Sequence, residues 1–238
     1  MRMLGRGRTR SGLPAIAAII AVAIATATVM QPLQVLAQSS AVTAEPTSGR
    51  FLVEGDRIVF AGDVPRDDDD SIAEVDVEEF LALARANPQI RTLELRSEGG
   101  YLADGLNFAH AVHELGFDTI VAHYCLSSCT DVFVAGDRRT LEPGARLGFH
   151  GTSWGREAIK SFYEEAREDY GWMDEMAYAS WVYQEGMRDQ RKSISHLVSR
   201  GIGIDFILRT LAVDGADMWY PTRSELIEAG VLHDGTQP

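Results

Sequence analysis

The amino-acid sequence predicts an α/β fold with a mostly parallel sheet. Short apolar runs at residues 90–95 and 119–122 have the length and composition of buried strands. They alternate with residues 77–84 and 102–115, in which apolar side chains recur every three or four positions, as on one face of a helix. Because this alternation is typical of strand–helix–strand crossover units, we expect helices packed on a parallel sheet.

The first 50 residues precede the predicted domain. Residues 1–37 carry four arginines, then an apolar run, then a small-residue end at Ala37, which is the pattern of an export signal. The apolar run approaches the length that spans a bilayer, so an uncleaved membrane anchor is the alternative. Residues 38–50 are polar and lack periodicity, as in a flexible tether. We therefore expect an exported, periplasmic protein with a single domain over residues 51–238.

The charge balance narrows the classes of partner. The formal net charge is −13, and it becomes −17 without residues 1–37, because four arginines and no acidic residue leave with that segment. Binding to nucleic acid or to anionic lipid needs a cationic surface. We therefore expect no nucleic-acid partner, and membrane contact only through an uncleaved N-terminal segment.

The elements of the N-terminal half follow in order. Residues 51–60 predict two strands joined by a tight turn, in which Gly55 relieves the backbone strain of the turn. The first helix ends at Asn87–Pro88, and the second begins after Gly100. After the next strand, a third helix is expected over residues 127–135.

The C-terminal half is predicted to be mainly helical. Residues 156–199 are charged and helix-prone, and we expect two helices with a break near Gly171 or Gly186. The many aromatic residues of this segment are typical of a packing or subunit-contact surface. A strand over residues 218–221 and a short helix capped by Thr222 complete the predicted fold.

Residues able to carry chemistry lie where predicted strands end. Gly99 and Gly100 follow one strand, and Ser127 and Ser128 open the helix that follows another. Functional groups gather at the carboxyl ends of parallel strands, where backbone N–H groups can bind an oxyanion. His150 ends a further apolar run and is a candidate base for a serine nucleophile.

Three sequence motifs occur in order along the chain. They are RSEGG at 96–100, CLSSC at 125–129 followed by VFVAGDRR at 132–139, and LGFH at 147–150. Together they resemble the Clp protease proteolytic subunit and its exported relatives, over about residues 57–152. The resemblance implies the ClpP/crotonase fold of repeated ββα units, with a long helical insertion after the strand of the catalytic histidine.

The resemblance also implies roles for single residues. Counting back from the Ala–Gly pair after the serine motif, the nucleophile of the family falls on Ser127 and its base on His150. Backbone N–H groups of Gly99, Gly100 and Ser128 would bind the oxyanion.

The third catalytic residue of the family is an aspartate late in the chain. It should precede the predicted strand at 218–221, and the alignment reaches Val213, so Asp214 is the candidate, with Asp217 and Asp205 nearby. Without an acid, a Ser–His dyad is still chemically possible.

The two cysteines of the chain, Cys125 and Cys129, enclose the serine pair. An even count in an exported protein favours a disulfide, and these two form the only intramolecular pair. A nucleophilic Cys129 and a metal site are the alternatives, although two cysteines without a nearby histidine pattern fall short of zinc spacing. We expect a disulfide that locks the serine segment, no metal and no cofactor.

The sequence therefore predicts a serine-type hydrolase, most simply a peptidase with a peptide or protein substrate. One alternative is a catalytically inactive protein of the same fold, which binds or scaffolds a partner and keeps a disulfide-stapled relic site. Another is an acyl-CoA enzyme of the crotonase type, for which an acidic, exported protein is a poor host. The resemblance further implies a homo-oligomer, a ring or a trimer, with residues 156–199 as the contact element.

Overall fold

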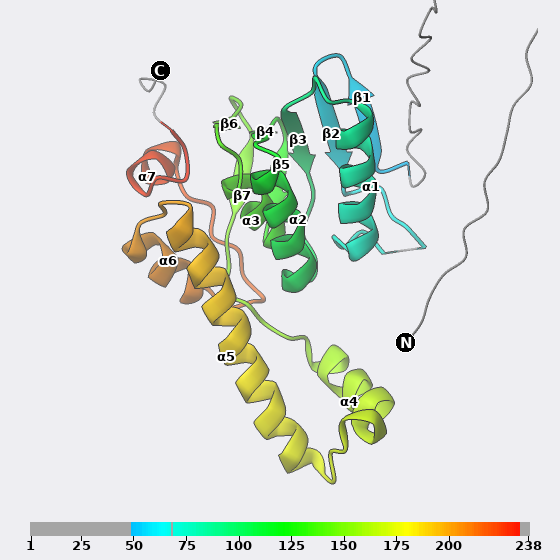
Figure 1. Ribbon diagram of the computed structural model, residues 1–238. Helices are drawn as coiled ribbons and strands as arrows, with labels where there is room; N and C mark the ends of the chain where they lie inside the picture. Colours follow the sequence, from blue (N-terminus) through cyan, green and yellow to red (C-terminus); the bar gives the residue numbers. More distant parts are fainter. Residues whose placement is uncertain (1–48, 68, 234–238) are drawn as a thin grey trace, which may run out of the picture. The chain divides into compact units, whose positions relative to one another are not determined.

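The computed structural model describes residues 49–67 and 69–233, and these form the α/β fold that the sequence predicts (Figure 1). The strands are β1 (Phe51–Glu54), β2 (Arg57–Ala61), β3 (Thr92–Arg96), β4 (Asp118–Val121), β5 (Tyr124–Leu126), β6 (Arg139–Leu141) and β7 (Arg146–Gly148). The helices are α1 (Glu74–Ala86), α2 (Leu102–Glu114), α3 (Ser128–Val134), α4 (Arg156–Tyr170), α5 (Glu175–Ser199), α6 (Ile204–Leu211) and α7 (Arg223–Glu228).

The strands form two sheets. The larger sheet has the order β1-β2-β3-β4-β6, in which β1 is antiparallel to β2 and the other neighbours are parallel. The smaller sheet pairs β5 with β7 in parallel. The predicted mostly parallel sheet is thus confirmed, and the carboxyl ends of β3, β5 and β7 lead into the segments of the predicted site.

Phenylalanine side chains join α1 and α2 to the larger sheet. The rings of Phe51, Phe60, Phe80, Phe108 and Phe117 lie with centroids 4.9 to 6.3 Å apart, and each is at most 1% exposed. Burial of each such ring contributes about 1.5–3 kcal/mol before entropy is counted. This cluster packs α1 and α2 against β1 and β2.

Helices α4 and α5 make up a helical hairpin, residues 156–199 (Figure 1). The predicted break occurs at Gly171, whose left-handed φ of 69° ends α4, whereas α5 continues through Gly186. Aromatic rings near and within the hairpin contact one another and form a small core of their own: Trp154, Phe162, Tyr163, Tyr170, Trp172, Tyr178 and Trp181. These aromatic side chains therefore stabilise the packing of the hairpin.

The last predicted strand is wrong. Residues 218–221 form no strand, because Trp219 alone pairs with Phe149, through two backbone hydrogen bonds of 2.9 Å. Pro221 has no N–H with which to extend the pairing. The strands β5 and β6 were not predicted, since segments of three residues carry no readable periodicity. Helix α6 was not predicted either, whereas α7 begins at Arg223 with Thr222 as the expected side-chain cap.

The N-terminal predictions fall almost entirely outside the described residues. The export signal and most of the tether belong to residues 1–48. Arg50, assigned to the tether, is instead part of the fold: its side chain is fully buried, donates to the carbonyl oxygen of Gly62 and lies 3.6 Å from Asp76. Within residues 49–67 and 69–233, no helix is long and apolar enough to cross a bilayer.

Candidate active site

The residues of the predicted site follow the carboxyl ends of three strands that the structure brings together. The glycine pair at 99–100 follows β3, Ser127 follows β5 directly, and His150 lies two residues after β7. Strands β5 and β7 pair in parallel, and a parallel bridge between Ser97 and Cys125 connects the end of β3 to β5. Three loops distant in sequence therefore meet at one edge.

Ser127 and His150 are in direct contact. The Oγ atom of Ser127 lies 2.7 Å from Nε2 of His150. Ser128 behaves differently, because its Oγ is buried against Gly105 and has no hydrogen-bond partner among the described residues. Of the two adjacent serines, the structure thus brings Ser127 to the imidazole.

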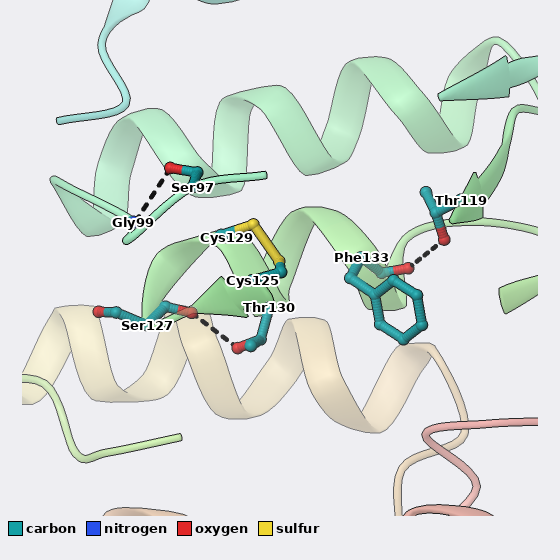
Figure 2. The surroundings of a disulfide bond; sticks show 8 residues. All are labelled: Ser97, Gly99, Thr119, Cys125, Ser127, Cys129, Thr130 and Phe133. Atoms are coloured by element: carbon teal, nitrogen blue, oxygen red, sulfur yellow. Dashed lines mark hydrogen bonds between the residues drawn. A yellow bond between two sulfur atoms is a disulfide. The ribbon is translucent and has the colours of Figure 1, made fainter. Parts of the chain in front are cut away.

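Ser127 has an unusual backbone conformation. Its φ of 53° and ψ of −131° lie in a region that residues other than glycine rarely adopt. The N–H of Ser127 donates to the carbonyl of Gly148 at 2.9 Å, and its carbonyl accepts from the N–H of Thr130 at 2.8 Å. The same carbonyl accepts from the hydroxyl of Thr130 at 2.7 Å (Figure 2). Such strain, about 1–3 kcal/mol, persists only where the surroundings over-determine it, and it is enriched at active sites.

A disulfide joins Cys125 of β5 to Cys129 of α3, which confirms the predicted bridge (Figure 2). Both cysteines are fully buried. In this state Cys129 has no thiol, so it is not a nucleophile. We call residues 125–129 the serine turn, because the disulfide closes a short ring with Ser127 at its centre.

Gly99 lies against the serine turn. Its φ is 103°, and a Cβ atom there would lie 2.7 Å from the carbonyl oxygen of Leu126 and 2.8 Å from Cβ of Ser127, so only glycine fits. The N–H of Gly99 donates to Oγ of Ser97 at 3.0 Å. The N–H of Gly100, by contrast, has no hydrogen-bond partner in the described part of the chain. Of the two predicted glycine donors, Gly99 thus already donates within the chain.

The imidazole of His150 is oriented by the backbone. Its Nδ1 atom lies 2.8 Å from the carbonyl oxygen of Gly151. A carbonyl only accepts, so Nδ1 carries the hydrogen, and in the neutral ring Nε2 then accepts from the hydroxyl of Ser127. Gly151 is itself anchored, because its N–H donates to the carbonyl of Val213 at 3.0 Å. This is the tautomer that a general base toward Ser127 requires.

The structure does not bring Asp214 to the imidazole. Its Oδ1 accepts from the N–H two residues later and its carbonyl accepts from Asp217, so it stabilises a local turn. Among the described residues, no hydrogen bond or ion pair joins His150 to Asp214, Asp217 or Asp205. The Nδ1 position, where a triad acid would bind, is occupied by the carbonyl of Gly151.

Sequence reasoning missed Asp131, one helical turn after Ser127. Its side chain is 7% exposed, and burial raises the pKa of this carboxyl to about 7. Its backbone carbonyl lies 2.9 Å from Nε2 of His196 on α5, and burial lowers the pKa of that imidazole. The available sequence signal was the position of Asp131 directly before the apolar run at 132–135. A helix that is buried on all sides also buries its acidic residue.

The roles of Gly151 and Thr130 were also missed. Gly151 acts through a backbone carbonyl, and Thr130 contacts the carbonyl of Ser127, so neither role depends on a recognisable side-chain motif.

A cavity of about 380 Å³ lies apart from this site, beside α6 and α7. Its lining includes Phe206, Trp219 and the ion pair of Arg209 with Glu225, at 2.7 Å, and it includes neither Ser127 nor His150. No group of three His, Cys, Asp or Glu side chains in the described chain is arranged to hold a metal ion.

Comparison of the chain with models of known protein families finds no match, and comparison with curated proteins finds none either. The resemblance to the Clp protease proteolytic subunit therefore stays a prediction from the three sequence motifs.

Proposed function

We propose that the protein is a serine hydrolase, most simply a ClpP-like peptidase, with Ser127 as nucleophile and His150 as general base. The observation that supports this function is the 2.7 Å hydrogen bond between Oγ of Ser127 and Nε2 of His150. A hydroxyl within reach of a base, whose other nitrogen is held by a hydrogen bond, is the arrangement that acyl transfer needs.

In the first step, Oγ of Ser127 attacks the substrate carbonyl carbon while its proton moves to Nε2 of His150. The carbonyl electron pair moves onto oxygen, and the resulting oxyanion needs hydrogen-bond donors. Ser128 is the first residue of α3, so its N–H has no acceptor within the helix. This N–H and that of Gly100 are the proposed donors, and loss of one such donor typically slows turnover about 100- to 1,000-fold.

In the second step, the imidazolium of His150 returns its proton to the leaving amine, and the carbon–nitrogen bond breaks. Water then hydrolyses the acyl ester on Ser127 with the same base. The Gly151 carbonyl keeps the productive tautomer, whose loss in a triad enzyme costs about 10⁴-fold. Because a carbonyl dipole stabilises an imidazolium less than a full negative charge does, we expect slower turnover than in a Ser–His–Asp enzyme.

A fluorophosphonate probe, which labels activated serines, tests this function. The wild-type protein is expected to be labelled at Ser127 and to cleave members of a peptide library. Ser127→Ala abolishes both activities, and His150→Ala slows labelling at least about 100-fold. Ser224→Ala, which removes an exposed hydroxyl on α7, is the matched control and retains both. A folded wild-type protein that is neither labelled nor able to cleave any peptide would refute the proposal.

The inactive scaffold is the second candidate, and the observation that favours it is the backbone carbonyl at Nδ1 of His150 in place of a carboxylate. In that case the folded protein binds a peptide or protein without cleaving it, and Ser127→Ala leaves the affinity unchanged.

We also propose export to the periplasm and assembly into a homo-oligomer. The buried disulfide supports an oxidising compartment, because disulfides are rare in the cytosol. Large apolar side chains exposed along the helical hairpin support self-association: Met173 at 94%, Met176 at 76%, Tyr183 at 71% and Met187 at 57%. Light scattering of the purified protein measures the oligomer directly, and a monomer at working concentration would contradict this assembly.

A further inference from the structure

We infer that the Cys125–Cys129 disulfide positions Ser127, so that the site becomes competent for catalysis only after this bond has formed. The inference rests on the proposed hydrolase function and concerns its regulation. The supporting observation is the location of the disulfide. Its two cysteines lie on either side of Ser127, which has an unfavourable backbone conformation and a hydroxyl in contact with His150.

The disulfide constrains both sides of Ser127. Cys125 lies two residues before it in β5, Cys129 lies two residues after it in α3, and their Cα atoms are 5.3 Å apart. The other contacts on the Ser127 backbone are hydrogen bonds from Thr130 and to Gly148. The bond is therefore the one covalent restraint across a turn that adopts an unfavourable φ and ψ.

Two free thiols do not fit the space of one disulfide. Bonded sulfur atoms lie about 2 Å apart, whereas non-bonded heavy atoms need about 3.5–4 Å. Both cysteines are fully buried, and Gly105 of α2 packs closely on Ser128 at the start of α3. The sulfur atoms gain this room by rotation of the side chains or by a displacement of β5 or α3, and the inference requires the displacement, because these two elements hold Ser127.

A displacement of this size matters for catalysis. A misplacement of about 1 Å at a reacting group can cost about 100-fold in rate. The 2.7 Å contact between Oγ of Ser127 and Nε2 of His150 is lost when the turn shifts by that amount. The dithiol chain is thus expected to fold with the same elements and to lack an activated serine.

The activating step is thiol–disulfide exchange with a small disulfide such as oxidised glutathione. One cysteine thiolate attacks the oxidant, forms a mixed disulfide and releases one glutathione thiolate. The second cysteine thiolate attacks the protein sulfur of that mixed disulfide and releases the other. Two electrons pass to the oxidant, and the two protons of the cysteine thiols end on two glutathione thiols. Because both cysteines are buried, this exchange takes place while the chain folds.

The test compares two redox forms of the full-length chain. The protein is refolded either with dithiothreitol or with oxidised glutathione, and mass spectrometry after alkylation counts the free thiols. Circular dichroism gives the folded fraction, and fluorophosphonate labelling of Ser127 is measured from pH 5 to pH 9. Per folded molecule, the disulfide form is expected to react about 100-fold faster, with a rate that rises as an imidazole loses its proton.

A purely structural disulfide would change only the folded fraction, and equal labelling rates and pH profiles per folded molecule would overturn the inference. The double variant Cys125→Ala/Cys129→Ala provides the measurement if the dithiol chain does not fold. It is expected to label slowly whether or not glutathione is present, and labelling as fast as the wild-type disulfide form would also overturn the inference. If the folded disulfide form itself is not labelled, the proposed hydrolase function fails instead.

Discussion

The serine turn and the helical hairpin differ in how their conformations are determined. All residues of α3 are buried, and the serine turn is held by a disulfide, by neighbouring strands and by Gly99. None of the residues of α4, all of which the structure describes, is buried, and the hairpin aromatics mainly contact one another. The site is thus shaped by the core, whereas α4 and the part of α5 that carries the aromatic rings have their own packing; the last turn of α5 contacts α3 through His196. Substitutions should therefore affect Ser127 in the serine turn and leave it unchanged in the aromatic part of the hairpin.

The largest contrast is expected between two glycine substitutions. Gly99→Ala places a Cβ atom 2.7 Å from a backbone oxygen at a φ of 103°, and we expect a loss of about 3 kcal/mol and at least about 100-fold slower labelling of Ser127. Gly186→Ala, in the interior of α5 with nothing within 4 Å, is expected to stabilise by about 0.5–1 kcal/mol without changing labelling. Urea unfolding and labelling rates measure both effects. Equal effects of the two substitutions would contradict the proposed difference between the serine turn and the hairpin.

A smaller effect is expected from pH, through Asp131. Its pKa of about 7 in the folded chain exceeds the usual value of about 4 in the unfolded chain, so folding favours the protonated carboxyl. The associated stability is present in full below about pH 4 and is lost as the pH rises toward 7. Between pH 5 and pH 8 we expect this carboxyl to lower the free energy of unfolding by roughly 2 kcal/mol, whereas His196, whose pKa burial lowers, acts in the opposite direction.

The variant Asp131→Asn keeps the size of the side chain and should remove this pH dependence, as measured by urea unfolding at the two pH values. The matched control, Asp169→Asn, removes an exposed carboxylate of α4 and should retain the wild-type dependence. The same change in stability between pH 5 and pH 8 in the wild-type protein and in Asp131→Asn would show that this carboxyl does not titrate as described.

The smallest effect is expected within the hairpin. The hydroxyl of Tyr178 donates to the carbonyl of Ile159 at 2.6 Å and ties α5 to α4. Tyr178→Phe removes this hydrogen bond and should cost about 1 kcal/mol of hairpin stability, detected as faster amide hydrogen exchange in α4. Labelling of Ser127 should stay the same. A slower labelling rate would show that the hairpin and the site are coupled.

Much of the fold could be predicted because helices and buried strands carry a periodic apolar pattern. The helices around residues 77–84 and 102–115 and the strand at 119–122 follow that pattern in the structure. The strand predicted at 218–221 failed, because pairing needs a partner strand as well as apolar residues, and Trp219 finds one paired residue in Phe149.

The pairing of the cysteines followed from the sequence, since Cys125 and Cys129 are the two present, and the choice of Ser127 over its neighbour is what the family resemblance implies. The group that orients His150 became known only from the folded structure. That group is the carbonyl of Gly151, a residue whose N–H donates to the carbonyl of Val213, more than sixty residues further along the chain. Every residue has a backbone carbonyl, and the direction in which that carbonyl points depends on how the chain folds. No side-chain motif in the sequence therefore identifies the carbonyl that meets His150.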